Sequence, residues 1–531
     1  TQVSSATCNE NFSTGTAYIG YTGDNVDQTY DGSISNLRFV KGQALYTSSF
    51  RPPYEPLTTT SQGATASNVK LLCCNDASSA TGSTVTPSTI SQYSAKGGTA
   101  TASTDSPFDD PDGFKFGEEG DQNLIKMGSY VGNSTANHEI YLGWEPQWWL
   151  VKNVTGAQNW QLLDTMRGWI VDDNDEYLVP NNDTAEGTFN FGNPTPTGFN
   201  LSNASSNWQN ESGSTYVYIA IRRPDGYVGK PADAGTDVFA MDTGNSSATG
   251  PAFDANFAVD FALNREFAGG DSWATTTRLT GRKWLKTNSN ESEQSAHAYY
   301  YDDYNNGWAK SMPSNYQSWM WKRGQGMDVV TYTGNGVSGL SIAHSMNAAP
   351  EMMIIKRTDA TQGWLVYHMG LNGAEGNTYE YGINLSDSAE WQESSTDEAW
   401  GGADPTSTHF TVGELSTNNT NGAEYISFLF SSVTGISKVG VYAGSNSAQS
   451  ITTGFQPRFV IIKNTANTDD WYVLDTTRGW AAGDDKRIYL NQSSAQSDQD
   501  VGAPTSTGFD LTANVRAFNQ AGRYYIYYAH A

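Results

Sequence analysis

The sequence has few of the residues that build disulfide frameworks, basic surfaces or membrane spans. Only 3 of its 531 residues are cysteine, too few for a disulfide framework, and Cys73 and Cys74 are adjacent. The 30 Lys and Arg are outnumbered by 56 Asp and Glu, which gives a net charge of −26. Such a surface repels phosphate backbones, so nucleic-acid binding is not expected. No apolar run reaches the roughly 18 residues of a membrane-spanning helix, so we expect a soluble chain without membrane insertion.

Charged residues of both signs are also scarce, at 16% of the chain against the roughly 25% typical of globular proteins. Their place is taken by Ser, Thr, Asn and Gly, together with 16 Trp, 29 Tyr and 21 Phe. So many rings can bury enough surface to offset the entropy of ordering the chain, which argues against disorder. The first residues, Thr-Gln-Val-Ser-Ser, include no Met and no apolar signal region, so we expect a mature or trimmed amino terminus.

Internal repetition is the strongest pattern that is present. The segment Asn159–Trp169 shares with Asp470–Trp480 a Trp, then Leu-Asp-Thr, then Arg-Gly-Trp at the same spacing. A Trp that opens a strand recurs about every 100 residues, at Trp160, Trp273, Trp364 and Trp471. Each unit contains five or more short alternating strands separated by Gly, Asn, Pro and Asp, which is typical of a β-sandwich or small barrel.

The repeats predict an all-β protein in which four related β-sandwich-like modules of about 100 residues follow a different amino-terminal region. The predicted modules are residues 114–226, 227–326, 327–434 and 435–531, of which the second is the most divergent. Residues 1–113 lack the repeat and end in a Ser-, Thr- and Gly-rich connector.

The amino-terminal region also resembles a known family. Residues Asp31–Leu57, followed by Lys70-Leu-Leu-Cys-Cys74, resemble the carboxy-terminal part of the laminin-G/concanavalin-A-like domains of marine bacteriophage tail-fibre-type proteins. The repeats, including Val330-Thr-Tyr-Thr-Gly334, resemble the uncharacterised β-modules of the same proteins. The resemblance implies that residues 1–113 form a partial concanavalin-A-like sandwich with a connector. It also implies a protein on the virion surface and supplies no catalytic residues.

Two loops are candidate binding sites. Asp172, Asp173 and Asp175 lie in an oxygen-rich loop that is a candidate for calcium, although it lacks the order of an EF-hand loop. The alternative is a solvated acidic turn. No other metal or cofactor is expected, because the six histidines are scattered without a pair at zinc-ligand spacing.

The second loop is rich in aromatic residues. Sugar rings stack on aromatic rings while amides and carboxylates bind the hydroxyls, and residues 299–308 have this composition. The candidate glycan-binding residues are Tyr299, Tyr300, Tyr301, Tyr304 and Trp308. The alternative is that these rings fill a module core, and for Trp319 and Trp321 the core is the favoured interpretation.

No catalytic motif is recognisable, since the chain lacks a Gly-x-Ser-x-Gly elbow and its many acidic residues give carboxylate pairs by chance. The first hypothesis is a non-enzymatic phage virion surface protein, a tail fibre or similar appendage, that attaches to host cell-surface glycan. The alternative is a structural decoration or spacer of the capsid or tail without a receptor role, and the third hypothesis is a polysaccharide depolymerase. Aromatic excess and exposed strand edges favour a homo-oligomer, and the resemblance implies a trimer in contact with other virion proteins.

Overall fold

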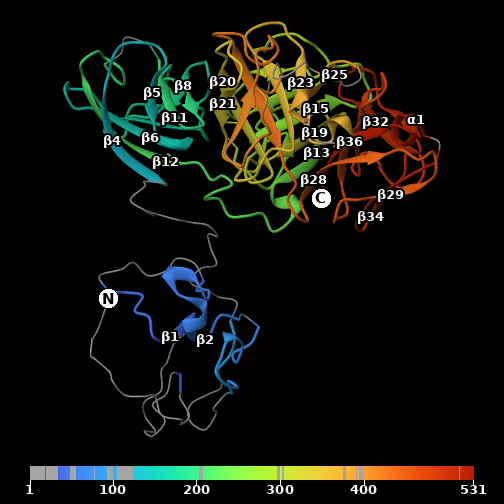
Figure 1. Ribbon diagram of the computed structural model, residues 1–531. Coiled ribbons are helices and arrows are strands. Elements are labelled where there is room, and N and C mark those ends of the chain that lie inside the picture. Colours follow the sequence, from blue (N-terminus) through green and yellow to red (C-terminus); the bar gives the residue numbers. More distant parts are fainter. Residues whose placement is uncertain are drawn as a thin grey trace. The chain divides into compact units, whose positions relative to one another are not determined.

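The computed structural model describes residues 18–19, 34–47, 56–76, 78–91, 100–103, 124–202, 207–295, 299–301, 304–374, 378–389, 392–393, 399–513 and 515–531. The chain divides into two compact units, Thr1–Phe114 and Lys115–Ala531. Regular structure in both units is almost entirely antiparallel β-sheet (Figure 1), so the all-β prediction is confirmed. No helix among the described residues is long and apolar enough to cross a membrane.

The described part of the first unit contains one small sheet. Its strands, in the order β1-β2-β3, are β1 (Leu37–Val40), β2 (Val69–Cys73) and β3 (Ser83–Val85). Its core is small and centres on Val69 and Leu72. Cys73 is buried beside Cys74, and burial raises the pKa of the Cys73 thiol to about 12, so this thiol is an inert packing group. The concanavalin-A-like sandwich stays a prediction.

The second unit is built from four sandwiches that repeat one topology. In each large sheet the last strand is central and pairs with the first and third strands of the same sandwich. Sandwich 1 has the sheet order β4 (Ile125–Val131), β12 (Thr215–Arg222), β6 (Pro146–Asn153), β7 (Gln161–Asp164). Its smaller elements are β10 (Pro194–Thr195), β11 (Gly198–Leu201) and β5 (His138–Tyr141) in one sheet, and β8 (Asp175–Tyr177) with β9 (Gly187–Phe189).

Sandwiches 2, 3 and 4 extend the same plan with further strands at one edge. The large sheet of sandwich 2 is β13 (Phe239–Thr243), β19 (Tyr316–Trp321), β15 (Phe261–Glu266), β16 (Ala274–Thr277), β17 (Trp284–Leu285), with β14 (Phe253–Asp254) and β18 (Gly307–Trp308) opposite. That of sandwich 3 is β20 (Met327–Thr333), β27 (Glu424–Phe430), β22 (Met352–Arg357), β23 (Trp364–His368), β24 (Tyr381–Asn384), β25 (Gln392–Glu393), with β21 (Leu340–Ala343) and β26 (His409–Val412) opposite.

Sandwich 4 closes the chain. Its large sheet is β28 (Ser437–Ala443), β36 (Tyr524–His530), β30 (Phe459–Asn464), β31 (Trp471–Asp475), β32 (Asp485–Tyr489), β33 (Ser497–Gln499), with β29 (Gln449–Thr452), β35 (Gly508–Leu511) and β34 (Pro504–Thr505) opposite. The described helices are all short: α1 (Arg516–Asn519), η1 (Ser61–Gly63), η2 (Ala66–Asn68), η4 (Gly235–Asp237), η5 (Leu371–Ala374) and η6 (Thr378–Glu380). Within the second unit, the strands of any one sheet all come from a single sandwich. The predicted domain boundaries stay a prediction.

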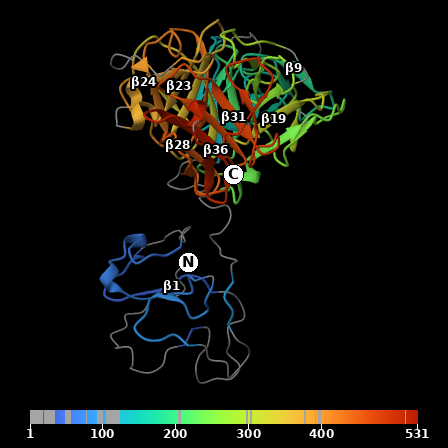
Figure 2. The ribbon, with the colours of Figure 1, turned by 90° about the vertical axis from the view of Figure 1, so that its right-hand side faces the viewer.

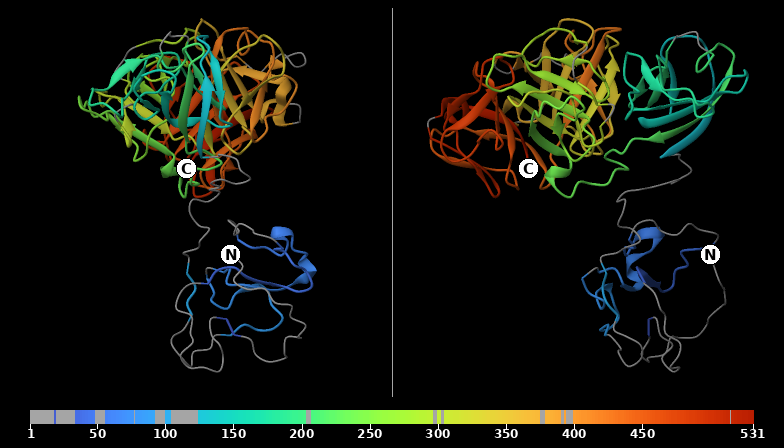
Figure 3. Two further views of the ribbon diagram at one scale, coloured as in Figure 1. Left: turned by 90° about the vertical axis from the view of Figure 1, so that its left-hand side faces the viewer. Right: turned by 180° about the vertical axis from the view of Figure 1, so that it is seen from behind.

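Three of the sandwiches share a second core. The large sheets of sandwiches 2, 3 and 4 pack together by their outer faces (Figures 2 and 3), so these sheets are buried on both sides. In β30, for example, all six residues are buried. Aromatic pairs cross each boundary: Phe261–Phe428, Phe430–Tyr528 and Phe239–Phe459, with ring centroids 4.8, 4.8 and 5.3 Å apart.

The repeated tryptophans close these three sandwiches into a ring. Each indole Nε1 donates a hydrogen bond to a backbone carbonyl of the neighbouring sandwich. Trp273 donates to Tyr489 at 2.6 Å, Trp364 to Lys286 at 2.9 Å and Trp471 to Asn384 at 2.9 Å. Sandwich 2 thus contacts 4, sandwich 3 contacts 2 and sandwich 4 contacts 3, which is a pseudo-threefold arrangement within one chain.

Candidate functional site

A polar cleft lies where sandwiches 1, 2 and 3 meet. Its volume is about 470 Å³, and it is lined by Asp172 of sandwich 1, by Lys283, Ser292, Glu293, Gln294 and Ser295 of sandwich 2, and by Thr358, Asp359 and Glu424 of sandwich 3. None of these nine residues is aromatic or aliphatic. The cleft is therefore lined mainly by hydrogen-bond donors and acceptors.

The walls of the cleft are tied together by hydrogen bonds between sandwiches. Lys283 Nζ lies 3.3 Å from a carboxyl oxygen of Glu293 and donates to the carbonyl oxygen of Asp172 at 3.1 Å. The backbone N–H of Glu293 donates to the carbonyl oxygen of Thr358 at 2.8 Å. These bonds join all three sandwiches, so the lining groups are held in place before any ligand arrives.

Two carboxyl groups of the cleft, those of Glu293 and Glu424, differ from ordinary surface carboxylates. Burial raises the pKa of Glu293 to about 7, although Lys283 opposes the shift. Burial also raises the pKa of Glu424, with a further contribution from the charge of Asp172. A carboxyl group that keeps its proton near neutral pH can donate as well as accept a hydrogen bond, so the cleft presents both kinds of partner to a hydroxyl-rich ligand.

A buried ion network joins sandwich 1 to sandwiches 2 and 3. Arg323, which follows β19, makes two parallel hydrogen bonds to Glu145 of sandwich 1, at 2.7 and 2.6 Å, and a third to Asp328 at 2.7 Å. Arg223, at the end of sandwich 1, reaches the same carboxylate of Asp328 at 3.2 Å. Burial favours the neutral form of Asp328, yet the two arginines prevail and lower its pKa to about 2.

The residues predicted to bind glycan lie elsewhere, and most of them are inaccessible. Tyr301 and Trp308 are 0% exposed and lie with Tyr299 in the core of sandwich 2, and Tyr304 is also buried. Rings in this position cannot stack on a sugar, so the expectation of an exposed aromatic loop is corrected in favour of the core alternative. Only Tyr300 is half-buried, and its ring lies under Arg282 and Lys310, so glycan binding there stays a prediction.

Trp319 and Trp321 were expected in a core and lie in one, although it is the core shared by sandwiches 2, 3 and 4. Trp319 Nε1 donates to Asp475 of sandwich 4 at 3.1 Å. The sequence alone suggested a core within one module.

The three aspartates predicted to bind calcium have separate roles. Asp175 is fully buried, and its two carboxyl oxygens accept the backbone N–H groups of Ile170 and Phe191 at 3.2 and 2.8 Å. Asp172 accepts from the side chain of Asn193, and Asp173 accepts from the next backbone N–H. Asp175 therefore braces a loop with both of its oxygens. Calcium binding stays a prediction, and within the described residues no group of three His, Cys, Asp or Glu is arranged to hold a metal ion.

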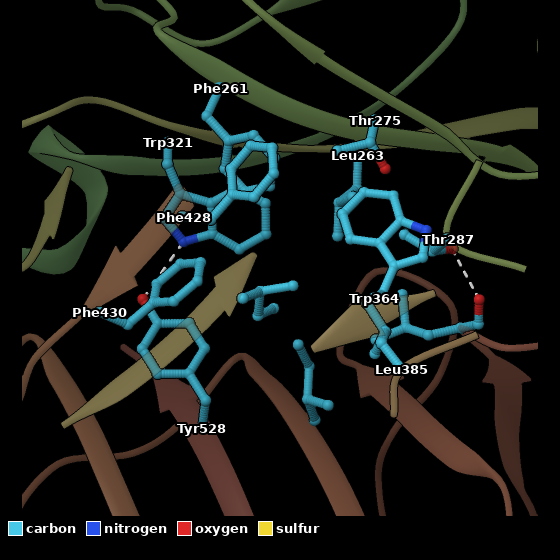
Figure 4. A pocket seen from close by; sticks show the side chains of 13 residues that line it. Phe261, Leu263, Thr275, Thr287, Trp321, Trp364, Leu385, Phe428, Phe430 and Tyr528 are labelled. Atoms are coloured by element: carbon cyan, nitrogen blue, oxygen red, sulfur yellow. Dashed lines mark hydrogen bonds between the residues drawn. The ribbon is translucent and has the colours of Figure 1, made fainter. Parts of the chain in front are cut away.

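The shared core also contains a small cavity, shown in Figure 4. It has a volume of about 20 Å³ and is lined by apolar and aromatic side chains from sandwiches 2, 3 and 4. At its rim, Trp321 Nε1 donates to the hydroxyl oxygen of Tyr528 at 3.3 Å and Thr287 donates to the carbonyl oxygen of Leu490 at 2.6 Å. A space of this size holds a water molecule at most, so it is a packing defect of the ring and not a ligand site.

Sequence reasoning missed the polar cleft entirely. Its nine residues come from segments as far apart as Asp172 and Glu424, and none stands in a recognisable motif. The available signal was the cluster of Ser, Glu and Gln at residues 292–295, which resembles any polar loop.

Comparison with known proteins assigns the chain to a family without assigning a role. No curated protein matches it. The model of a family described as a domain of unknown function, DUF7483, matches residues 60–223 and 287–531. These ranges cover more than three quarters of the chain and include every strand of sandwiches 1, 3 and 4. The chain therefore belongs to the DUF7483 family of domains of unknown function.

Proposed function

We propose that the protein is a non-enzymatic surface subunit of a virus particle, a tail fibre or similar appendage, that attaches the particle to a glycan on the host cell. The polar cleft between sandwiches 1, 2 and 3 carries the proposal, because its groups match the alternating donors and acceptors of a polyol. The resemblance of the chain to marine bacteriophage tail-fibre-type proteins supports the setting on the virion surface.

The arrangement of the cleft supports binding without chemistry. Its carboxyl, hydroxyl, amide and ammonium groups are braced by inter-sandwich hydrogen bonds, which lowers the entropic cost of ordering them around a ligand. Sandwiches 2 and 3 are themselves fixed by the tryptophan ring. A glycan bound here contacts three modules at once, so its affinity depends on their relative placement.

Binding of the purified, fluorescently labelled protein to a glycan array and to host cells tests the proposal. We expect saturable binding to the host strain, none to a phage-resistant strain, and a loss of affinity of about tenfold or more in Glu293→Gln or Glu424→Gln. The matched control is Glu414→Gln, an exposed position outside the cleft. A folded protein that binds neither cells nor glycans contradicts the proposal, as do particles that lack it and still adsorb normally.

One observation favours a second candidate, a structural decoration or spacer without a receptor role. Burial of four of the five rings at residues 299–308 removes the aromatic platform expected of a glycan-binding loop. Quantitative mass spectrometry of particles separates the two roles, because decorations reach hundreds of copies and fibres tens at most.

The third hypothesis, a polysaccharide depolymerase, is tested in the same samples. The depolymerase hypothesis is supported by one observation: two carboxyl groups in one cleft, Glu293 and Glu424, have a raised pKa. Release of reducing ends from host glycan that disappears in Glu293→Gln supports this enzyme and rules out the non-enzymatic role.

A further inference from the structure

The large sheet of sandwich 1 has an apolar outer face that is less buried than the corresponding faces in sandwiches 2, 3 and 4. Met127 on β4 is 64% exposed and Ile221 on β12 is 38% exposed. Five further apolar residues of this outer face are half-buried: Trp148 and Leu150 on β6, Ile219 on β12, Trp160, and Leu162 on β7. None of these residues belongs to a buried cluster among the described residues.

Strand register identifies the counterpart of each residue. Tyr216 pairs with Asn153 and with Tyr130 in sandwich 1, as Tyr525 pairs with Asn464 and with Tyr442 in sandwich 4. Counting from these pairs, the positions of Met127, Trp148, Leu150, Ile219 and Ile221 are held in sandwich 4 by Val439, Phe459, Ile461, Tyr528 and His530. All five of these counterparts are buried, and all but His530 belong to the core that sandwiches 2, 3 and 4 share.

The contact that covers this face in sandwiches 2, 3 and 4 has two unlike sides. On the donor side, the repeated tryptophan (Trp273, Trp364 or Trp471) and a nearby cationic side chain donate hydrogen bonds to the next sandwich. The cations are Arg265, which donates to the carbonyl oxygens of Gln492 and Ser494, Lys356, which donates to that of Asn290, and Lys463, which donates to that of Ser388. The acceptor side is the loop that carries those carbonyl groups. Each sandwich of the ring uses its donor side on one neighbour and its acceptor side on the other.

Sandwich 1 carries both sides. Trp160 stands at the position of Trp471, since the backbone N–H of each donates to an asparagine at 3.0 Å, Asn181 and Asn491 respectively. Lys152 stands at the position of Lys463. Its Nζ donates to the carbonyl oxygen of Asn153 at 2.6 Å, the contact within the sandwich that Lys356 also makes with Arg357.

The acceptor side of sandwich 1 follows from the same register. The carbonyl oxygen of Val179 corresponds to that of Tyr489, the acceptor of Trp273. Residues 182–184 correspond to the loop that accepts Arg265, Lys356 and Lys463.

We propose that three copies of this chain assemble through the outer face of sandwich 1 into a ring like that of sandwiches 2, 3 and 4. A contact between unlike sides closes into a ring or continues as a filament, and this contact closes at three in the same chain. The face is apolar, as the covered counterparts are, so its burial supplies the driving force. Trp160 of one copy donates to Val179 of the next, and Lys152 donates to the loop 182–184. The inference does not depend on the proposed function.

Sedimentation and native mass spectrometry of the full chain at micromolar concentration test the stoichiometry. We expect three times the chain mass of 57.6 kDa. Ile221→Arg together with Leu150→Arg places two charges on the outer face, and we expect this variant to be monomeric with an unchanged circular dichroism spectrum. The matched control is Val337→Arg, at an apolar position that is 61% exposed in sandwich 3, and it stays trimeric. A monomeric or dimeric wild-type chain, or a double variant that stays trimeric, overturns the proposal.

A photo-crosslinking residue at position 160 identifies what covers the face. We expect crosslinks to residues 179–184 of another copy, distinguished by mixing chains of two isotopic labels. Crosslinks to residues 1–114 mean that the amino-terminal unit covers the face, and crosslinks within one label only mean that no second copy does. Either result overturns the proposal. Trp160→Phe, which removes the indole donor and keeps the ring, weakens the trimer about tenfold.

Discussion

Arg323 and Glu145 are 178 residues apart in sequence and form a two-pronged ion pair that is buried from solvent. The pair joins the first sandwich to the second, and Asp328 extends the network to the start of the third. Because its partner Asp328 is also shared with Arg223, the network fixes both the position of sandwich 1 and the start of the segment that leaves it.

The first prediction concerns this network. In Glu145→Ala, Arg323 loses a bidentate partner while it stays buried, so we expect a loss of about 3–5 kcal/mol in the unfolding of sandwich 1. Denaturant unfolding and limited proteolysis of the segment 224–234 measure it. Glu186→Ala removes a partly exposed pair with Arg167 and should cost at most about 1 kcal/mol. If the two substitutions lower the free energy of unfolding equally, the buried network stabilises the protein no more than the exposed pair does.

The second prediction concerns Asp175. In Asp175→Asn, one oxygen becomes an NH₂ group that faces the N–H of Ile170 or of Phe191, so we expect a loss of about 1–3 kcal/mol in denaturant unfolding. The matched control is Asp173→Asn at an exposed position two residues away, which should be nearly neutral. If added calcium stabilises the wild type and neither variant, the loop is an ion site as the sequence suggested.

The third prediction concerns the ring. Trp471→Phe removes the indole donor, and the half-buried carbonyl group of Asn384 loses this hydrogen bond, so we expect a loss of about 1–2 kcal/mol. The same substitution at Trp160, measured at concentrations where the chain is monomeric, should leave unfolding unchanged. An unaffected midpoint in Trp471→Phe would mean that the ring is held by apolar contact alone.

The fourth prediction concerns acid stability. His368 is buried, with Nδ1 accepting from the N–H of Gly370 at 2.9 Å and Nε2 lying 3.2 Å from the carbonyl oxygen of Tyr527, and burial lowers its pKa to about 4. Between the unfolded pKa of about 6.5 and the folded value, only the unfolded chain takes up the proton, so stability is full above pH 6.5 and falls towards pH 4.

The measurement is denaturant unfolding from pH 7 to pH 4. We expect the stability of the wild type to fall by about 3 kcal/mol more than that of His368→Gln over this window, because glutamine does not titrate. Burial lowers the pKa of His530 to about 3, so His530 also destabilises the fold as the pH falls, whereas Glu293, with its raised pKa, has the opposite effect. Both contributions are the same in the wild type and in His368→Gln, so they cancel in the difference. Parallel curves would contradict a neutral buried His368.

Much of the fold could be predicted from the sequence because the repeats are local. The recurring Trp at 160, 273, 364 and 471 and the alternating last strands indicated four all-β modules, and the large sheets follow that plan. The repeat could not reveal that three modules bury a second face. The signal was present in strands such as Phe459–Asn464, where apolar residues run without alternation, as in a sheet covered on both sides.

The candidate site could not be predicted, for a related reason. The cleft depends on how whole modules are placed, and residues such as Asp172 and Glu424 meet only through that placement. The aromatic segment 299–308 gave a misleading signal because its polar residues suggested a surface loop. Its rings instead complete the core of sandwich 2, as Tyr301 does through its hydroxyl contact with Thr276 at 2.6 Å.

In a ring formed by one chain, equivalent positions can hold different residues, which is impossible in an assembly of identical subunits. In a true trimer the three residues nearest the symmetry axis are the same, so each must be compatible with two copies of itself. In sandwiches 2, 3 and 4 the register-equivalent positions on the last strands hold Trp321, Phe430 and His530, and the hydrogen bond from Trp321 to Tyr528 forms once where symmetry would demand three. Duplication within one polypeptide therefore allows each position to diverge separately, and dilution cannot separate the parts.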